Sequence, residues 1–448
     1  MGYFREKRVF YDDFTRTKQH GLFSFDKPYE LDKNSLAAYL CLGYVPGDQT
    51  LFTDIQCLSP LSSIFDKKNS YIKLSNIFLK TPDTNHTPKE LKEIIIHSIE
   101  KLYKSEKIQV VPLSGGMDSR IILAALCEIT DASNINTYTF GVPGAYDYDI
   151  PNKIAKKIGT KHYNFSAEDT VYTVEGLIRA AVASDGNTEV FHPLVLNNVV
   201  DYYGSSAIYW SGFAGDLVGG AFGKELSSIN PKQLLINYEK RGINFLTEHD
   251  TLKLSPIISA GEKMSDCVSA AEACFWVNHV ERYTGHHIFR NDMDLHAPFV
   301  DPILLKFFFT LPENERKGKK FFNESFSSMF QDVFDIPTKD YGYKYSKLQY
   351  RQTWHRSKFY LSALGWRLLP NIITHPNIAY IDMRHAINQR NDIKNCVDNL
   401  FSDLAQRNII DNNRMYQFLS DHRTEKKNYT KDIINLASLE IILKAANL

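Results

Sequence analysis

The stretch that most constrains this chain is Val110–Ser119, which reads VVPLSGGMDS and is followed by the apolar run Arg120–Leu126. An apolar run, a glycine-rich polar turn and a second apolar run with helical spacing predict a strand, a loop and a helix. Adjacent glycines allow the backbone N–H groups of such a loop to converge on an anion, and the helix adds the positive end of its dipole. The stretch therefore predicts a phosphate-binding loop made by Leu113, Ser114, Gly115, Gly116 and Ser119.

An aspartate, Asp118, stands inside this loop. No Gly-Lys-Ser/Thr follows the glycines and the spacing is not GxGxxG, so the pattern is neither of the common nucleotide loops. A carboxylate beside a polyphosphate is repelled unless a divalent cation lies between them, so Asp118 predicts bound Mg²⁺. The alternative, an ordinary exposed Ser/Gly turn, is disfavoured by the strand before the loop and the helix after it.

Ser114–Ser119 resembles the S-G-G-x-D-S pyrophosphate loop of the ATP pyrophosphatases. The surrounding sequence resembles the synthetase half of the asparagine synthetase family, which also contains β-lactam synthetases and lasso-peptide cyclases. The resemblance runs from about residue 36 to about residue 345. It implies ATP as a ligand, Mg²⁺, and an α/β fold of the adenine nucleotide alpha hydrolase-like (HUP) type.

Residues 36–60 resemble the linker that leads into the synthetase domain of this family. Members with a glutaminase domain carry it before this linker, with a nucleophilic cysteine directly after the initiator methionine. Here Gly2 occupies that position, and fewer than forty residues precede the linker. We therefore expect this chain to lack a glutaminase and to take its nitrogen from elsewhere.

The composition of the chain argues against several other classes of protein. Lys+Arg and Asp+Glu both number 52, which gives no sign of bulk nucleic-acid binding. The six cysteines contain no C-x-x-C pair, which argues against a zinc ribbon or a disulfide framework and favours a reducing compartment. No apolar run has the length of a membrane span. We expect a cytoplasmic protein with no membrane association.

Strand-like segments at 135–140, 162–165 and 207–210 alternate with helical segments at 150–158 and 177–184. This alternation predicts a parallel sheet with helices on both faces, with ligands at the carboxyl ends of the strands. From about residue 230 the pattern becomes helical. We expect a short N-terminal segment and linker at 1–90, an ATP-binding core at 91–230, and a mostly helical part at 231–448 that completes the site.

A second match to the family lies at Tyr138–Gly141 and continues through Asp147 to His162. Phe140 and Gly141 end a predicted strand beside the phosphate loop, so an apolar wall and a close backbone could hold adenine. The alternative for Phe140 is an ordinary core position.

The third match is Ser211–Gly220, which resembles the family's S-G-x-G-[GS]-D-E-x-x-G-G turn. It implies that Ser211 and Gly212 contact the nucleotide and that Asp216 is a second Mg²⁺ ligand facing Asp118. A simple turn is the alternative. Phe213 and Leu217 replace two acidic residues of the family, which leaves the general base in doubt and predicts a less polar acceptor pocket.

The fourth match is Met293–Asp301, followed by Lys319–Phe326. Asp294 stands where the family has Glu, and it would be either a general base or a capping or ion-pairing residue. For the lysine that neutralises the leaving pyrophosphate, Lys339 is our first choice and Lys344 our second. Arg120 would either bind a substrate carboxylate or cover its helix.

Together these features imply a carbon–nitrogen ligase that adenylates a substrate carboxylate, releases pyrophosphate, and passes the acyl group to an amine with release of AMP. The nitrogen donor is open between free ammonia, a separate glutaminase partner, a second substrate and an amine within the substrate. We favour specialised biosynthesis over primary asparagine synthesis. The alternatives are a thiolation enzyme of the same loop type and a catalytically inactive nucleotide-binding or interaction protein.

Overall fold

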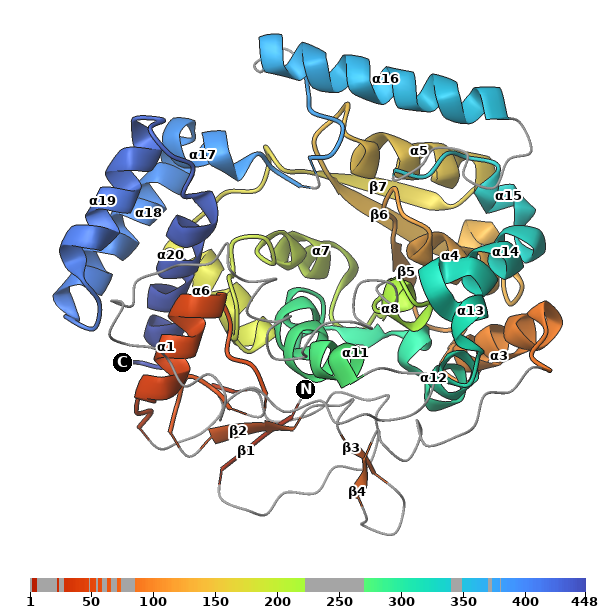
Figure 1. Ribbon diagram of the computed structural model, residues 1–448, viewed down its shortest axis with the longest axis horizontal. Helices are drawn as coiled ribbons and strands as arrows, with labels where there is room; N and C mark the ends of the chain where they lie inside the picture. Colours follow the sequence, from red (N-terminus) through yellow and green to blue (C-terminus); the bar gives the residue numbers. More distant parts are fainter. Residues whose placement is uncertain are drawn as a thin grey trace.

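The computed structural model describes residues 2–5, 22–23, 28–47, 49–53, 55–58, 63–65, 71–73, 85–221, 270–339, 349–369, 373–378 and 380–448, and all structural statements concern these. A five-stranded sheet lies at the centre of the molecule (Figure 1). Its spatial order is β7-β6-β5-β8-β9 and every neighbouring pair is parallel. The strands are β5 (Gln109–Pro112), β6 (Ile135–Gly141), β7 (Lys161–Ser166), β8 (Ile208–Trp210) and β9 (Asp294–His296). The predicted parallel α/β fold is therefore confirmed.

Helices cover both faces of this sheet because successive strand residues point to opposite sides. Val111 and Ile208 face a core shared with α3 (Pro88–Glu100), α4 (Asp118–Cys127) and α5 (Tyr146–Ile158). Val110 and Tyr209 face the opposite core, where α7 (Val195–Tyr203) packs. The predicted two-sided helix layer is confirmed.

The local sequence explains where the central helices begin. Thr87 caps α3 by accepting a hydrogen bond from the Glu90 N–H at 3.1 Å, and Pro88 occupies the first turn. In contrast, α4 begins at Asp118 with no side-chain cap. The first turn of α4 places the positive end of its helix dipole directly after the loop that follows β5.

The C-terminal part is helical, as predicted. One group of helices extends the α3–α4 side of the sheet: α11 (Ala270–Phe275), the π-helix η2 (Trp276–Thr284), η3 (Gly285–His287), η4 (Pro298–Val300), α12 (Pro302–Phe309), α13 (Glu313–Arg316), η5 (Lys317–Lys319), α14 (Lys320–Met329) and α15 (Gln331–Phe334). The long helix α16 (Gln349–Leu368) follows, at the top of Figure 1.

A second core forms at the far end of the chain. There α17 (Met383–Gln389), α18 (Asn391–Gln406), α19 (Asn412–Arg423) and α20 (Thr430–Ala445) pack with α1 (Lys33–Leu42) and α6 (Val174–Ser184). The remaining elements are η1 (Ala132–Asn134), α8 (Gly215–Val218) and two antiparallel pairs, β1 (Gly2–Arg5) with β2 (Ile55–Leu58) and β3 (Ser63–Phe65) with β4 (Tyr71–Lys73).

No helix in the described part of the chain is both long and apolar enough to cross a bilayer. The domain boundaries at residues 90 and 230 stay a prediction, and the second of them lies outside the described residues.

Candidate functional site

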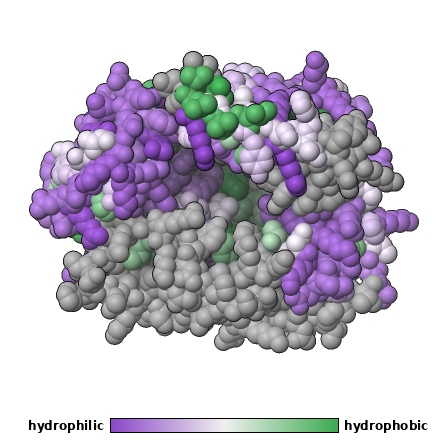
Figure 2. Space-filling model, turned by 45° about the horizontal axis from the view of Figure 1, so that its top comes forward, coloured by the Kyte–Doolittle hydropathy of each residue, from purple (hydrophilic) through white to green (hydrophobic). Residues whose placement is uncertain are grey.

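A cavity of about 630 Å³ opens at the carboxyl edge of the sheet. The space-filling view shows the corresponding face hollowed at its centre, with hydrophobic surface in the hollow (Figure 2). The ends of β5, β6 and β8 contribute its floor, and the η2–η3 segment contributes another wall. This is the edge at which open parallel sheets bind ligands.

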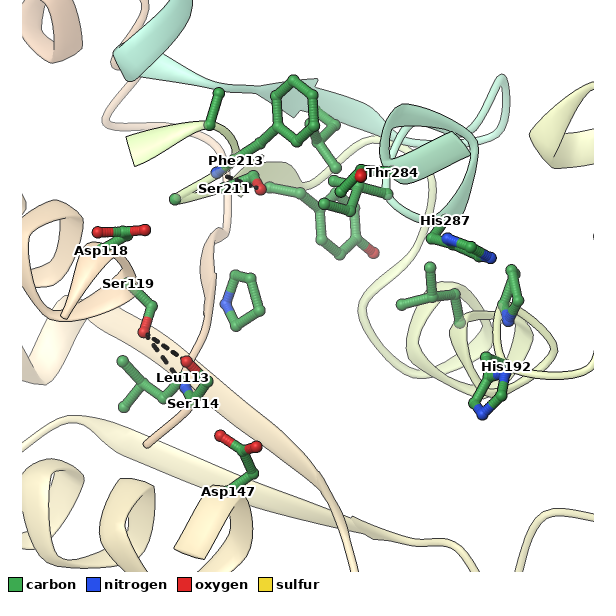
Figure 3. A pocket seen from close by; sticks show the side chains of 18 of the residues that line it. Leu113, Ser114, Asp118, Ser119, Asp147, His192, Ser211, Phe213, Thr284 and His287 are labelled. Atoms are coloured by element: carbon green, nitrogen blue, oxygen red, sulfur yellow. Dashed lines mark hydrogen bonds between the residues drawn. The ribbon is translucent and has the colours of Figure 1, made fainter. Parts of the chain in front are cut away.

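The predicted phosphate loop, Ser114–Ser119, lines this cavity between β5 and α4. The Ser114 N–H donates to Ser119 Oγ at 3.2 Å (Figure 3). The Gly116 N–H donates to Ser114 Oγ at 3.2 Å. The Gly115 N–H donates to Asp147 Oδ1 at 2.8 Å. The loop is therefore held by its own hydroxyls and by one carboxylate from α5, and its donors converge at the start of a helix.

The two predicted metal ligands converge on one lysine. Lys319 Nζ lies 3.2 Å from Asp118 Oδ1 and also contacts Asp216 Oδ1. Burial raises the pKa of Asp118 to about 7; the Lys319 ammonium opposes this shift and the Asp216 carboxylate adds to it. Burial alone would lower the pKa of Lys319, but the two carboxylates outweigh it and raise that pKa. Asp118 and Asp216 thus face a common point, and their predicted role as Mg²⁺ ligands stays a prediction.

These two carboxylates fit a magnesium site in which phosphate oxygens and water supply the other ligands. The described residues contain no cluster of three or more acidic, histidine or cysteine side chains with metal-binding geometry. A cation held here would therefore depend on the phosphates as well as on the protein. Lys319 itself was not assigned a role from the sequence, although it opens the Lys319–Phe326 segment of the fourth motif.

Two glycines let the third motif approach the phosphate loop. A Cβ on Gly212 would lie 2.8 Å from the Asp118 backbone carbonyl carbon and 2.8 Å from the Ser119 backbone nitrogen. A Cβ on Gly215 would lie 2.7 Å from Asp118 Cγ. Ser211, beside them, lines the cavity and accepts a hydrogen bond from the Phe213 N–H at 3.1 Å. The motif therefore has glycine where any side chain would displace Asp118.

Gly212→Ala is expected to lower the free energy of unfolding by about 1–3 kcal/mol, because the clash is with the backbone of the first turn of α4, which cannot move aside as a flexible side chain can. Denaturant unfolding measures this loss. Gly116→Ala is the matched control, since a Cβ there meets only Ser114 Oγ, at 3.3 Å. Equal stability of the two variants would contradict the close approach.

The predicted adenine wall also lies at the cavity. Phe140 lines it and packs edge-on against Tyr380, with ring centroids 5.3 Å apart. Gly141 ends β6 with φ of 142°, a backbone conformation that favours glycine. Tyr380 is a wall residue that no sequence motif indicated.

Lys339 lies against the phosphate loop. Its N–H donates to the Gly115 carbonyl oxygen at 2.9 Å, and its ammonium lies 3.0 Å from Asp147 Oδ2. Lys344, our second choice for the same role, lies outside the described residues. Lys339 therefore lines the cavity beside the phosphate loop, and its role toward pyrophosphate stays a prediction.

Arg120 has neither of the roles considered for it. Its guanidinium is fully buried and donates to the carbonyl oxygens of Gly115, Val333, Ile336 and Pro337 at 2.7–3.2 Å. It therefore fastens the segment that precedes Lys339 to the phosphate loop, and it does not reach the cavity.

Asp294 lies at the opposite edge of the sheet from the loop. It begins β9, pairs in register with Ile208 at the start of β8, and lies 2.8 Å from Lys107 Nζ and 3.2 Å from His296 Nε2. Its neighbours Met293 and Leu295 line the cavity, but Asp294 does not. Between the two alternatives left open by the sequence, the geometry favours the ion pair over the general base.

The wall facing the loop is largely apolar. Phe213 and Leu217, the two departures from the family motif, line it together with Phe275, Val280 and Ile288. This lining is consistent with the less polar acceptor pocket that the sequence predicts. At its far end lie His192 and His287, across the pocket from Asp118 and Ser114 (Figure 3).

The fold and the site define an α/β protein with a pyrophosphate-type loop at the carboxyl edge of a parallel sheet. Residues 90–190 match the model of the family described as asparagine synthase. A putative glutamine-hydrolysing asparagine synthetase 2 of Methanocaldococcus jannaschii is 28% identical over 155 residues, which cover 32% of this chain.

These matches confirm the resemblance to the asparagine synthetase family. The aligned part covers only 30% of the length of that relative.

Proposed function

We propose that this protein is an ATP-dependent ligase that adenylates a substrate carboxylate and transfers the acyl group to ammonia or an amine. The observation that carries the proposal is the convergence of Asp118 and Asp216 on Lys319 beside the phosphate loop. Lys339 pairs with Asp147, the carboxylate that holds Gly115 of the same loop. A carboxylate is a poor acyl donor until one of its oxygens is converted into a leaving group. Transfer of AMP from ATP to that oxygen, with loss of pyrophosphate, makes the conversion.

Each group has a distinct part in this scheme. Mg²⁺ held by Asp118 and Asp216 would neutralise phosphate charge when bound. The loop N–H groups, now on Ser114, Ser119 and Asp147 oxygens, would exchange these acceptors for phosphate oxygens. Lys319 and Lys339 would balance the charge that develops on the departing pyrophosphate. Phe140 would lie against the adenine ring.

The acceptor half of the cavity favours a substrate with apolar or ring surface over a small dicarboxylate. Its lining of Phe213, Leu217 and Phe275 offers few partners for charged groups. This supports specialised biosynthesis over asparagine formation, and it is compatible with a nitrogen donor that is separate from the carboxylate substrate or part of it.

The same apolar lining favours one other candidate, a nucleotide-binding protein without ligase activity. A thiolation enzyme has less support: Cys41, Cys57, Cys127, Cys274 and Cys396 all lie away from the cavity lining. Cys267 is outside the described residues.

Incubation with ATP, Mg²⁺ and a panel of amino, sugar and hydroxy carboxylates tests the proposal. We expect pyrophosphate and AMP with at least one carboxylate, and pyrophosphate exchange into ATP before any amine is added. Formation of ADP and orthophosphate would contradict cleavage at the α–β linkage. Tight nucleotide binding with no turnover would support the inactive alternative.

A further inference from the structure

A buried carboxylate at the far end of the cavity holds two histidines. Glu189 Oε1 lies 2.7 Å from His192 Nδ1 and 3.0 Å from His287 Nε2. Glu189 Oε2 accepts hydrogen bonds from the Phe191 N–H at 2.9 Å and the His192 N–H at 3.2 Å. The Glu189 side chain is only 7% exposed, so these contacts fix it in place.

The position of His192 differs from that of Glu189. The His192 side chain is 46% exposed, and it lines the cavity that contains the phosphate loop. It lies shortly before α7 and opposite the phosphate-loop side chains (Figure 3). His192 and Glu189 also line a second cavity of about 630 Å³, formed with residues of the α16–α17 connection. The imidazole is therefore reachable from two sides.

The hydrogen bond determines what the ring can do. With Nδ1–H donated to Glu189, Nε2 of a neutral His192 carries the lone pair and is the atom that accepts a proton. Burial would lower the pKa of His192, but the Glu189 carboxylate outweighs burial and raises it. The other titratable groups nearby are His287, on the same carboxylate, and Tyr380, whose ring lies 6.3 Å from that of His192. A histidine with a carboxylate behind it and a cavity in front is the arrangement of a general base.

We propose that His192, oriented by Glu189, is the base that takes the proton from the amine attacking the acyl-adenylate. The inference rests on the proposed ligase function and supplies the base that the apolar Phe213 and Leu217, and the ion-paired Asp294, do not. The nucleophile it takes is ammonia or a primary amine. Glu189 is a positioning residue in this scheme, since it touches only the histidines and the backbone.

The step balances without another reactant. The amine lone pair forms the C–N bond at the acyl carbon, and the nitrogen proton passes to His192 Nε2. The bond between the acyl carbon and the AMP oxygen then breaks, and AMP leaves with the bonding pair. His192 afterwards returns its proton to water through either cavity.

The test separates the two half-reactions in the full-length protein. With a carboxylate that supports pyrophosphate exchange in the wild type, His192→Gln should keep exchange within about threefold. Amide formation from ammonia should fall about 10²-fold or more, the range of general-base catalysis. Hydroxylamine has a much less basic nitrogen than ammonia, so its adduct loses the N–H proton readily to water. It should therefore still trap the acyl-adenylate within a few-fold of the wild-type rate.

The outcomes distinguish failure of the proposed ligase function from failure of the proposed role of His192. Wild-type exchange with no carboxylate of the panel would overturn the proposed function itself. Normal exchange together with unchanged amide formation in His192→Gln would overturn only the role of His192, as would an equal loss with ammonia and hydroxylamine. His97→Gln is the matched control, because His97 is 70% exposed on α3; it should change neither half-reaction.

The pH dependence gives a readout that a merely structural role would not move. His192 must be neutral to act, so amide formation should rise as pH passes its raised pKa. Glu189→Gln removes the charge that raises this pKa, and the rising limb should move to lower pH. Nitrogen-15 NMR of histidine-labelled protein follows the same pKa without any substrate. An unshifted His192 pKa in the wild type, or no change in Glu189→Gln, would overturn the proposal.

Discussion

Asp118→Asn should reduce ATP-dependent pyrophosphate release on the order of 10³-fold, while the protein still folds. Asparagine keeps the size of the side chain and can still accept the Asp216 N–H hydrogen bond. It loses the charge that faces Lys319 and that would hold a divalent cation against the phosphates. Pyrophosphate release measured against Mg²⁺ concentration reports the effect, and excess Mg²⁺ should not restore the rate.

A second readout for this variant does not depend on turnover. Mg²⁺ with a non-hydrolysable ATP analogue should raise the thermal midpoint of the wild type and should raise that of Asp118→Asn much less. Asp131→Asn is the matched control, because Asp131 is exposed and makes no side-chain cap at η1. Full turnover in Asp118→Asn would contradict a role for Asp118 as a metal ligand.

Lys319→Met should have the next largest effect, and it should act on both stability and activity. The ammonium is 10% exposed and balances two carboxylates, of which Asp118 is 19% exposed. Losing it leaves Asp118 without its cation, although the pKa of Asp118, already raised to about 7, lets that group take up a proton instead. We therefore expect a loss of about 1–3 kcal/mol at pH 8, below that of a fully buried broken pair, and a smaller loss at pH 6.

Mg²⁺ should offset this instability. Since Lys319 occupies the point on which both carboxylates converge, Mg²⁺ should raise the melting temperature of Lys319→Met more than that of the wild type. Pyrophosphate release should nevertheless fall about 10²-fold, because the leaving group loses a positive partner. Lys320→Met is the control: its ammonium pairs with Glu315 at the surface. Comparable losses in both variants would contradict a site-specific role for Lys319.

The sheet and the phosphate loop could be predicted because their signals are local. A short apolar run before Ser114 and a helical run after Ser119 determine β5 and α4, and Asp118 is part of the same segment. The prediction of Asp216 as a site residue could not be made from a local pattern. It rested on the resemblance of a distant turn, Ser211–Gly220, to a family motif. The close approach of Gly212 to Asp118 was not predicted from that motif and is seen only in the structure.

The remainder depended on contacts between distant segments. β9 has only three residues and pairs only because β8 lies beside it, so its sequence carries no strand pattern. That pairing also places Asp294 at the amino edge of the sheet. The role of Lys319 depends on its contact with Asp216, and the role of Glu189 depends on its contacts with His192 and His287. These contacts are seen only in the folded chain. A lone lysine or glutamate in a sequence gives no such information.

Arg120 has a practical consequence for redesign. By clamping Gly115 to the carbonyls before Lys339, it joins the phosphate loop and the segment that carries Lys339 into one unit. Libraries that seek new acyl acceptors should therefore vary Phe213, Leu217 and Phe275 and leave this unit intact, so that altered selectivity need not come at the expense of nucleotide handling.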